Sequence, residues 1–360
     1  MQAIAVEQGR GEPTVLGLER PEAGPGEVLV RTLRVGVDGT DHEVIAGNHG
    51  EPPAGEGHLV LGHEAVGVVV DGGDTRLSAG DVVVPTVRRP PDGGGNGYFE
   101  RGESDMAPAG QYHERGIVGA HGYMSEYFVT DASFLLSVSP ALADVGFLVE
   151  PLSVAVKGLE LATASRSSFA WQPDSAAVLG NGSLGLLTLA YLKHVAGYDR
   201  LYCLGRRDRP DPTIDIIEGL GATYVDSRET PVSAIPAVHE PLDLVFEATG
   251  YAKHAFETID ALAPNGVGVL LGVPEPLEFE VDGGRLHREL VLHNKALVGS
   301  VNSRMDHFEA AAAALSTVPE WFLDRLVTGI YGVDRLSAAF DDDDTTIKTA
   351  VKFSQYEERR

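Results

Sequence analysis

The chain has 360 residues, of which 43% are hydrophobic, so it has room for two domains with apolar cores and is neither disordered nor collagen-like. A net charge of −25 repels polyanions and argues against nucleic acid and anionic membranes as partners. Only six of the 28 basic residues are lysines, and with the acidic excess this composition indicates a halophilic protein adapted to molar salt. At that ionic strength the Debye length falls to about 3 Å and acidic surfaces repel one another less.

Membrane spans and disulfides are not expected. No apolar run approaches the roughly 20 residues of a transmembrane helix, and the first residues lack the basic and apolar regions of a signal peptide. The single cysteine, Cys203, excludes an internal disulfide and a zinc site built from several cysteines. We therefore expect a soluble, cytoplasmic protein.

The first 150 residues are expected to form a mostly β, barrel-like domain. Short β-type runs separated by glycine and proline cover 3–6, 27–35, 64–70, 81–85 and 123–129. The stretch 90–110 is rich in proline and glycine and is predicted to be a loop or a small lobe. A helical pattern over 150–164 then leads into the next domain.

From about residue 176 to residue 300, β-type runs alternate with helical patterns, which indicates an α/β domain with a doubly wound parallel sheet. The predicted strands cover 176–179, 200–204, 222–225, 242–246, 267–271 and 296–299, with helices such as 213–220 and 255–262 between them. The remaining stretch 306–353 returns to helix and short strand. The segment 286–300 is a candidate for pairing with the sheet edge of a second subunit.

A glycine motif lies between the first predicted strand of this sheet and the helix that follows. Residues 180–185 read Gly-Asn-Gly-Ser-Leu-Gly, which fits the G-x-G-x-x-G pattern of dinucleotide binding. In that context the turn is tight and the backbone can approach a pyrophosphate at the helix N-terminus. A glycine-rich turn that binds nothing is the alternative.

The residues after the second predicted strand indicate which dinucleotide is bound. NAD-binding proteins usually carry an acidic residue here for the ribose 2′-hydroxyl. This chain instead has Arg206 and Arg207, which suit a 2′-phosphate, so NADP is favoured. Asp208 keeps NAD as the weaker alternative, and surface arginines paired with neighbouring acids remain a third interpretation.

Four possible metal ligands lie at the ends of β-type runs or at the domain junction. They are Asp38, the adjacent pair His63 and Glu64, and Glu150, whose following residue is proline. Such ends can converge in the fold, and one imidazole with several carboxylates suits zinc. The spacing alone does not distinguish a metal site from a structural histidine and ordinary carboxylates.

The order of these features over nearly the whole chain resembles the zinc-dependent medium-chain dehydrogenase/reductase family. The features are Gly62-His63-Glu64, then Gly80-Asp81-Val82-Val83, then Glu150-Pro151, then the glycine turn. Residues 35–42, the arginine pair and the acidic composition resemble the glucose 1-dehydrogenase branch, particularly its haloarchaeal members. The resemblance implies a GroES-like, mostly β catalytic domain over 1–155, to which 303–360 return, and an NADP-binding Rossmann domain over 156–302.

The resemblance also implies roles for individual residues, with Asp38, His63, Glu64 and Glu150 as the metal ligands and catalytic group. Asp38 stands where most relatives have a cysteine thiolate, so zinc should be held less firmly. The stretch 90–110 lacks the cysteines that often bind a structural zinc in relatives, which leaves one zinc per chain. The implied substrate contacts are Thr40, Glu114, Glu150 and Asn302. The implied cofactor contacts are Gly180, Asn181, Gly182, Ser183, Leu184, Gly185, Arg206, Arg207, Leu271, Gly272, Val273, Ser300, Val301 and Asn302.

The predicted reaction is the oxidation of β-D-glucose at C1 to D-glucono-1,5-lactone, with hydride transfer to NADP⁺. Zinc would act as a Lewis acid and Glu150 as base or proton relay. A polyol or alcohol dehydrogenase of the same family is the first alternative, because pocket residues select the substrate hydroxyl. A catalytically silent NADP-binding or quinone-reductase-like protein is the second. Family members form homodimers or homotetramers, and the sequence does not choose between them.

Overall fold

The computed structural model describes residues 1–7, 11–91, 94–341 and 343–357, and the chain divides into two compact units. Unit 1 contains Met1–Glu150, Asn302–Ser316 and Val327–Arg360, and unit 2 contains Pro151–Val301 and Thr317–Leu326. None of the described helices is long and apolar enough to cross a membrane.

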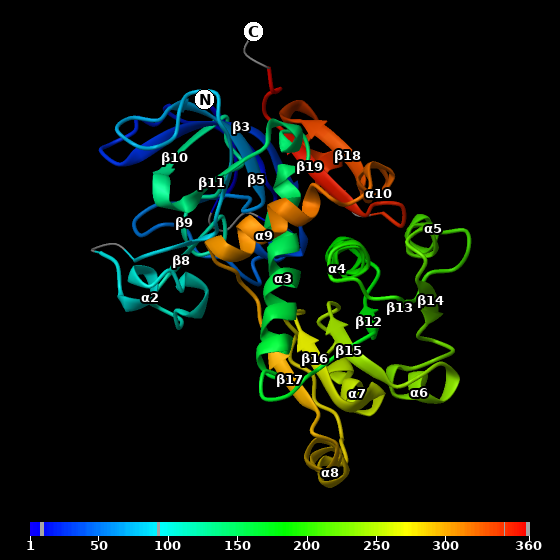
Figure 1. Ribbon diagram of the computed structural model, residues 1–360. Helices are drawn as coiled ribbons and strands as arrows, with labels where there is room; N and C mark the ends of the chain where they lie inside the picture. The colour runs from blue at the N-terminus through cyan, green and yellow to red at the C-terminus, as the bar shows by residue number, and fades with distance from the viewer. Residues whose placement is uncertain (8–10, 92–93, 342, 358–360) are drawn as a thin grey trace. The chain divides into compact units, whose positions relative to one another are not determined.

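Unit 1 is built around the long strand β3 (Glu27–Val37), which pairs with β5 (Ala65–Asp71), β10 (Tyr127–Asp131) and β19 (Lys348–Lys352). Figure 1 shows the red strand β19 beside the blue strand β3, so the two ends of the sequence meet in one sheet. Because β3 is buried along most of its length on both faces, its apolar residues do not alternate strictly with polar ones, and Arg31, Thr32 and Arg34 interrupt two apolar runs.

Shorter elements complete unit 1. The β3 sheet continues through β6 (Val82–Pro85) and β11 (Leu135–Val138) on one side and β18 (Val327–Gly332) on the other. The remaining strands and helices of this unit are β1 (Gln2–Glu7), β2 (Thr14–Gly17), β4 (His58–Val60), β7 (Arg88–Arg89), β8 (His113–Arg115), β9 (Gly119–Ala120), α1 (Gly39–Ala46), α2 (Gly97–Glu100), α9 (Met305–Leu315) and α11 (Leu336–Ala339).

One expectation for unit 1 needs correction. The strand predicted over 123–129 begins only at Tyr127, because the N–H groups of Tyr123 and Met124 donate to the carbonyls of Gly62 and Leu61 instead of to β3. The stretch 90–110 is a small lobe, which was one of the two predicted alternatives, since it contains α2 and a 3-10 turn over Ser104–Met106. Residues 92 and 93 of that stretch lie outside the described residues.

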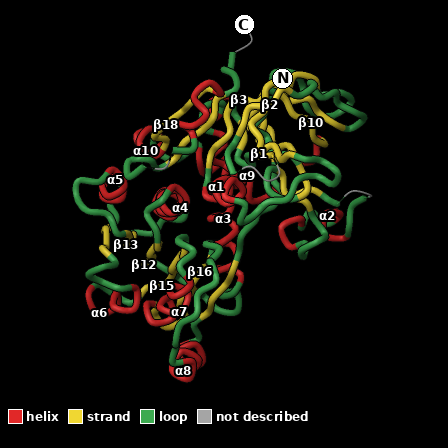
Figure 2. The backbone as a smooth tube through the Cα atoms, turned by 180° about the vertical axis from the view of Figure 1, so that it is seen from behind, coloured by secondary structure: helices red, strands yellow, loops and turns green. Residues whose placement is uncertain are grey.

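Unit 2 is the predicted doubly wound α/β domain, and its sheet order β14-β13-β12-β15-β16-β17 is that of a Rossmann fold. All five strand pairs are parallel. Helices α4 and α5 lie on one side of the sheet and α6 and α7 on the other (Figures 1 and 2). The strands are β12 (Ser175–Leu179), β13 (Arg200–Gly205), β14 (Thr223–Asp226), β15 (Leu242–Glu247), β16 (Leu262–Leu270) and β17 (Ala296–Gly299). The helices are α3 (Val149–Ala164), α4 (Ser183–His194), α5 (Pro212–Gly219), α6 (Ile235–Val238), α7 (Ala252–Ala261), α8 (Gly283–His293) and α10 (Glu320–Leu326).

Boundaries in unit 2 also differ from expectation. Strand β16 begins five residues before the predicted 267–271, and the first part of the segment 286–300 is helix α8. Helix α10 belongs to unit 2, although the whole of 303–360 was assigned to the catalytic domain. The reason is packing, because the Trp321 ring lies against Gly219 of α5, where an added Cβ would meet its Cη2 at 2.9 Å.

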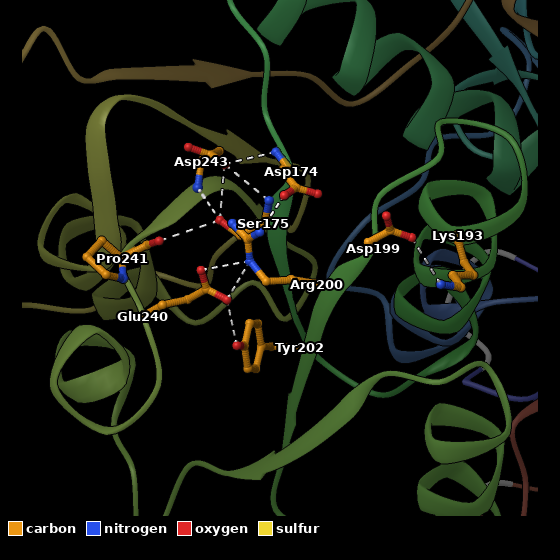
Figure 3. Close-up of polar contacts among 9 residues, drawn as sticks. All are labelled: Asp174, Ser175, Lys193, Asp199, Arg200, Tyr202, Glu240, Pro241 and Asp243. Carbon is orange, nitrogen blue, oxygen red and sulfur yellow. Dashed lines mark hydrogen bonds and ion pairs between the residues drawn. The ribbon is translucent and has the colours of Figure 1, made fainter.

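Polar contacts tie together the N-terminal ends of the parallel strands (Figure 3). The Asp243 carboxylate accepts from the backbone N–H groups of Asp174 and Ser175 at 2.9 and 3.1 Å. Arg200 donates through Nε to both oxygens of Glu240 at 2.9 Å, and the Tyr202 hydroxyl donates to the same carboxylate at 2.8 Å. Since ligands bind at the carboxyl ends of such strands, we assign these contacts to the stability of the sheet.

Two histidines, His58 and His121, stack on one another beside strand β4 in unit 1. The Val60 N–H donates to Nδ1 of His121 at 3.2 Å, so the neutral ring carries its proton on Nε2 and donates it to Glu56 at 2.8 Å. His58 stacks on His121 with the ring centroids 4.8 Å apart. Burial lowers the pKa of His121 below the ordinary value of 6.5.

This arrangement predicts a loss of stability in mild acid. As the pH falls below about 6.5, the unfolded chain takes up a proton that folded His121 still refuses, so the free energy of unfolding decreases until the pH reaches the lower folded pKa. His121→Phe should flatten this slope, whereas the exposed control His49→Gln should keep it. Urea unfolding in molar KCl between pH 8 and pH 5 measures the difference, and equal slopes in all three proteins would contradict the assignment.

Candidate active site

The turn that carries Asp38 joins β3 to α1. Asp38 is the N-cap of α1, and its Oδ1 accepts from the Asp41 N–H at 3.1 Å while Asp41 Oδ2 accepts from the Asp38 N–H at 3.2 Å. The other oxygen of Asp41 accepts from the Gly62 N–H at 3.1 Å. Asp41 therefore connects the Asp38 turn to the loop that carries His63.

The four predicted metal ligands come together in unit 1. Ligand atoms of His63, Glu64 and Glu150 all lie within 4.8 Å of one another, and so do those of Asp38, Asp41 and His63. His63 belongs to both groups, and its Nε2 lies 3.5 Å from Asp38 Oδ2. His63 is buried, and so are the carboxylates of Glu64 and Glu150. Buried carboxylates are unusual unless a positive charge compensates them.

Burial and crowding of like charges shift the pKa values in this cluster. Burial, reinforced by the neighbouring carboxylates of Glu64 and Asp38, raises the pKa of Glu150 to about 7. Burial opposes protonation of His63, but Asp38 and Glu150 outweigh it and raise the pKa of His63 to about 9. Burial also raises the pKa of Asp41 to about 8, with Asp38 adding to the effect. With all of its carboxyl groups ionised, the site would have an excess of buried negative charge.

These residues fit a divalent cation. The Nδ1 atom of His63 is buried and has no hydrogen-bond partner among the described residues, so a donor atom is left without its usual contact. One imidazole with carboxylates matches the donor set of a catalytic zinc site, and a dication would neutralise the excess charge. Asp38, His63, Glu64 and Glu150 are the residues that would hold it.

Lys348 supplies a positive charge beneath this cluster. Its side chain is 1% exposed, and its Nζ lies 2.5 Å from Glu64 Oε2 and donates to the Val37 carbonyl at 2.9 Å. The pKa of Lys348 is raised despite its burial, because Glu64 and Asp38 stabilise the charged form. Glycine is required at position 36 above this pair, because an added Cβ would lie 2.1 Å from Glu64 Oε2.

A second group of possible ligands, Glu56, His58 and His121, also satisfies the distance criterion for a metal site. The hydrogen bonds argue against a metal there. Nδ1 of His121 accepts from Val60 and Nε2 donates its proton to Glu56, so neither nitrogen has a lone pair left for an ion. We therefore assign this group to the packing of β4.

Two of the predicted substrate residues, Glu114 and Asn302, meet in unit 1. Nδ2 of Asn302 donates to Glu114 Oε1 at 3.2 Å, and Oδ1 of Asn302 accepts from the Ser303 N–H at 2.8 Å. Thr40, in the first turn of α1, contributes a hydroxyl hydrogen bond to the Asp38 carboxylate. Asn302 was also assigned to the cofactor, but it falls in unit 1, whereas Ser300 and Val301 fall in unit 2.

The glycine turn of unit 2 forms a cradle between β12 and α4. Gly180 has a φ of 112°, a conformation that side chains disfavour. An added Cβ at Gly185 would lie 2.0 Å from the Gly180 carbonyl oxygen, so only glycine lets the helix approach the strand here. An added Cβ at Gly182 would meet nothing within 4 Å, so that position faces open space. Ser183 and Leu184 begin the first turn of α4, with Gly182 as N-cap.

Arg206 and Arg207 follow directly after β13, where the second strand of the fold ends. Arg206 is exposed, and the Arg207 N–H donates to the Tyr224 hydroxyl at 2.8 Å. Sequence reasoning missed Arg228, which binds the Asp208 carboxylate at 2.6 Å and also pairs with Asp226. Since Arg228 occupies Asp208, that carboxylate is not left as a ribose ligand and the NAD alternative weakens.

The remaining predicted cofactor residues lie at the carboxyl ends of the strands. Asn181 covers Gly205, where an added Cβ would meet the Asn181 amide at 2.7 Å. The N–H groups of Leu271 and Gly272 donate to the Glu247 carbonyl, and the Ser300 N–H donates to Leu270. Val273 and Val301 are 75% and 55% exposed.

Buried Glu247, which sequence reasoning missed, shapes this edge. Its Oε1 accepts from the Thr249 N–H at 2.8 Å and its Oε2 from the Gly250 N–H at 3.3 Å. These bonds hold the turn that follows β15.

The cradle predicts different outcomes for two glycines. Gly185→Ala should lower the free energy of unfolding by at least about 2 kcal/mol, because its Cβ overlaps a backbone carbonyl that cannot rotate away. Gly182→Ala is the matched control and should melt like the parent protein, since its Cβ meets no atom. Thermal melts of the three proteins in molar KCl test this, and an unchanged melting temperature for Gly185→Ala would refute the packing argument.

The buried ion pair predicts the effect of removing Lys348. Lys348→Met leaves the Glu64 carboxylate buried without its cation, so it should lower the free energy of unfolding by about 3–5 kcal/mol at neutral pH. Lys352→Met, on the same strand and only partly buried, should change it little. Denaturant unfolding measures both, and similar values for the two variants would show that the pair does not stabilise the fold.

The comparisons with known proteins agree with this geometry. Residues 143–353 match the family described as "Glucose dehydrogenase C-terminus", and residues 24–140 match the "Alcohol dehydrogenase GroES-like domain". The glucose 1-dehydrogenase of Haloferax mediterranei is 65% identical over 355 residues, which cover 98% of this chain and 99% of the relative. The glucose 1-dehydrogenase of Haloarcula marismortui is 60% identical over 353 residues, with 98% and 99% covered.

A solved structure of a glucose dehydrogenase is also similar to this chain. Haloferax mediterranei glucose dehydrogenase in complex with NADP, Zn and gluconolactone superposes with a TM-score of 0.97 at 65% identity, covering 99% of this chain and 100% of that chain. With the GroES-like first unit and the parallel-sheet second unit, this similarity establishes the family. The chain belongs to the zinc-dependent medium-chain dehydrogenase/reductase family, in its glucose 1-dehydrogenase branch.

Proposed function

We propose that this protein oxidises β-D-glucose at C1 to D-glucono-1,5-lactone and transfers the hydride to NADP⁺, with one zinc ion per chain. The observation that carries the proposal is the convergence of Asp38, His63, Glu64 and Glu150 in a chain that is 65% identical to a glucose 1-dehydrogenase. A silent NADP-binding protein would have no use for this buried and electrostatically costly group.

The reaction divides into a proton and a hydride. The C1 hydroxyl loses its proton while the C1 hydrogen leaves as hydride for the nicotinamide, so the products are lactone, NADPH and a proton. Bound zinc supplies Lewis-acid stabilisation of the developing negative charge on the sugar oxygen. We assign the proton to Glu150, because its buried carboxylate lies in the cluster that contains His63 and Glu64.

The residues of unit 2 support NADP as the cofactor. The 180–185 cradle takes the pyrophosphate, with the open position at Gly182 leaving room for its close approach. Arg206 and Arg207 take the 2′-phosphate, and the pairing of Asp208 with Arg228 removes the competing carboxylate. On this proposal, Gly182→Ala keeps its fold and binds NADP more weakly.

The substrate contacts favour a sugar over a simple alcohol. Thr40, Glu114, Glu150 and Asn302 are all polar, and a substrate with a hydroxyl on every carbon needs several such partners. The alternative is a polyol or alcohol dehydrogenase with the same fold and metal, since small pocket changes select the hydroxyl.

We also propose that the enzyme is a homodimer or homotetramer. Strand β17 is an edge strand, and two aliphatic side chains at the end of the preceding helix, Val291 and Leu292, are 62% and 59% exposed. An exposed strand edge next to apolar side chains is a surface that a second subunit can cover. The acidic composition and the buried thiol of Cys203 suit the cytoplasm of a salt-accumulating cell.

The decisive experiment measures initial rates in molar KCl with D-glucose, sorbitol, threonine and ethanol, using NADP and then NAD. We expect turnover with glucose and NADP, a loss of turnover after dialysis against EDTA, and recovery when zinc is added back. The Asp38 oxygen is a weaker zinc ligand than a thiolate, so dialysis should remove the metal. Turnover of another alcohol but not of glucose would contradict the proposed substrate and leave the proposed metal site standing. Full activity after EDTA would show that zinc is not required for the reaction.

A further inference from the structure

Arg88 is a buried arginine in unit 1 that none of the assignments above uses. It lies on β7, is 5% exposed, and its guanidinium stacks on the Tyr112 ring at 3.7 Å from the centroid. Its Nη1 donates to the carbonyls of Asp105 at 2.9 Å, Ser104 at 3.3 Å and Ala107 at 3.4 Å. One side of the guanidinium thus holds the backbone of the 90–110 lobe.

The other side of the guanidinium holds Glu114. Arg88 Nε donates to Glu114 Oε1 at 3.0 Å, and the two residues are directly paired between β7 and β8. Asn302 Nδ2 donates to the same Oε1 at 3.2 Å. Both donors use Oε1, so the second oxygen, Oε2, takes no hydrogen bond from the described residues and is available to accept one from a hydroxyl.

The segment after Asn302 is connected to the same lobe. Arg304 lies 3.9 Å from the carboxylate of Asp105, whose side chain is fully buried. The lobe is therefore held by Arg88 from β7 and by Arg304 from the segment 302–304. Glu114 and Asn302 lie between these two attachments, so the position of both depends on them.

We propose that Arg88 is a positioning residue for sugar recognition: it fixes the rotamer of Glu114 so that Oε2 points to one sugar hydroxyl, and it holds the lobe that borders this contact. The inference rests on the proposed function and adds a specificity determinant to it. Only a planar guanidinium can serve a carboxylate and several carbonyls at once while stacking on a ring. Lysine has one nitrogen and cannot replace it.

The test compares Arg88→Lys with the parent enzyme in molar KCl. We expect the KM for D-glucose to rise about tenfold, the size expected for a lost charge-assisted hydrogen bond, while kcat and the KM for NADP change less than about threefold. Arg101→Lys is the matched control. Arg101 lies in the same lobe but is exposed and pairs with Glu103, so its KM values should stay unchanged.

A set of 2-, 3-, 4- and 6-deoxyglucoses separates positioning from general loosening. The sugar that lacks the hydroxyl bound by Glu114 should have the same KM in the parent and in Arg88→Lys, while the other deoxy sugars keep the tenfold difference. An equal rise in KM for every sugar, or no rise for glucose in a folded variant, overturns the proposal.

A second variant guards against misfolding. Tyr112→Leu removes the ring that supports the guanidinium and leaves every charge in place, so it should show a smaller rise in KM with the same sugar selectivity. If the parent enzyme does not oxidise glucose, the proposed function fails on its own. If it does oxidise glucose and the KM values of a folded Arg88→Lys are unchanged, only the role of Arg88 is refuted.

Discussion

The buried contact between Lys348 and Glu64 is the constraint on which the first unit depends. It places a positive charge beneath several buried carboxylates, which would otherwise repel one another and be stable only when protonated. The same contact joins β19 to the strand and loop that carry Asp38 and His63. The stability of the fold and the state of the metal ligands are therefore two results of one ion pair.

Other parts of unit 1 also place one buried cation against several acceptors. Few cations are available in this acidic chain, and two that are buried in unit 1 each serve several acceptors: Arg88 binds Glu114 and three carbonyls, and Lys348 binds Glu64 and a carbonyl. At the surface the acidic excess has fewer partners, which suits solutions where salt screens repulsion. The interactions of these two buried cations are stronger than those at the surface, because the local dielectric is low.

Much of this architecture could be predicted from the sequence. The glycine turn and the alternation of strand and helix depend on neighbouring residues, and periodicity reveals them. His63 and Glu64 are adjacent, and Glu150 precedes a proline, but this spacing alone did not distinguish a metal site, and their role was implied only by the resemblance to a family. Lys348, Arg88 and Arg228 were missed because their partners are remote in sequence and a single lysine or arginine has no pattern of its own. The bond between Asp41 and Gly62 could not be predicted for a related reason, because it depends on how two loops meet.

The position of Lys348 has a consequence for how the protein is made. Lys348 lies 311 residues downstream of Val37, the carbonyl partner of its ammonium group, so the sheet around β3 stays incomplete while the ribosome synthesises everything between. The second unit has all its strands and its last helix by residue 326 and can fold first. During that interval the carboxylates around Glu64 lack the ammonium group of Lys348, and the protons or metal ions of the cell are what can neutralise them.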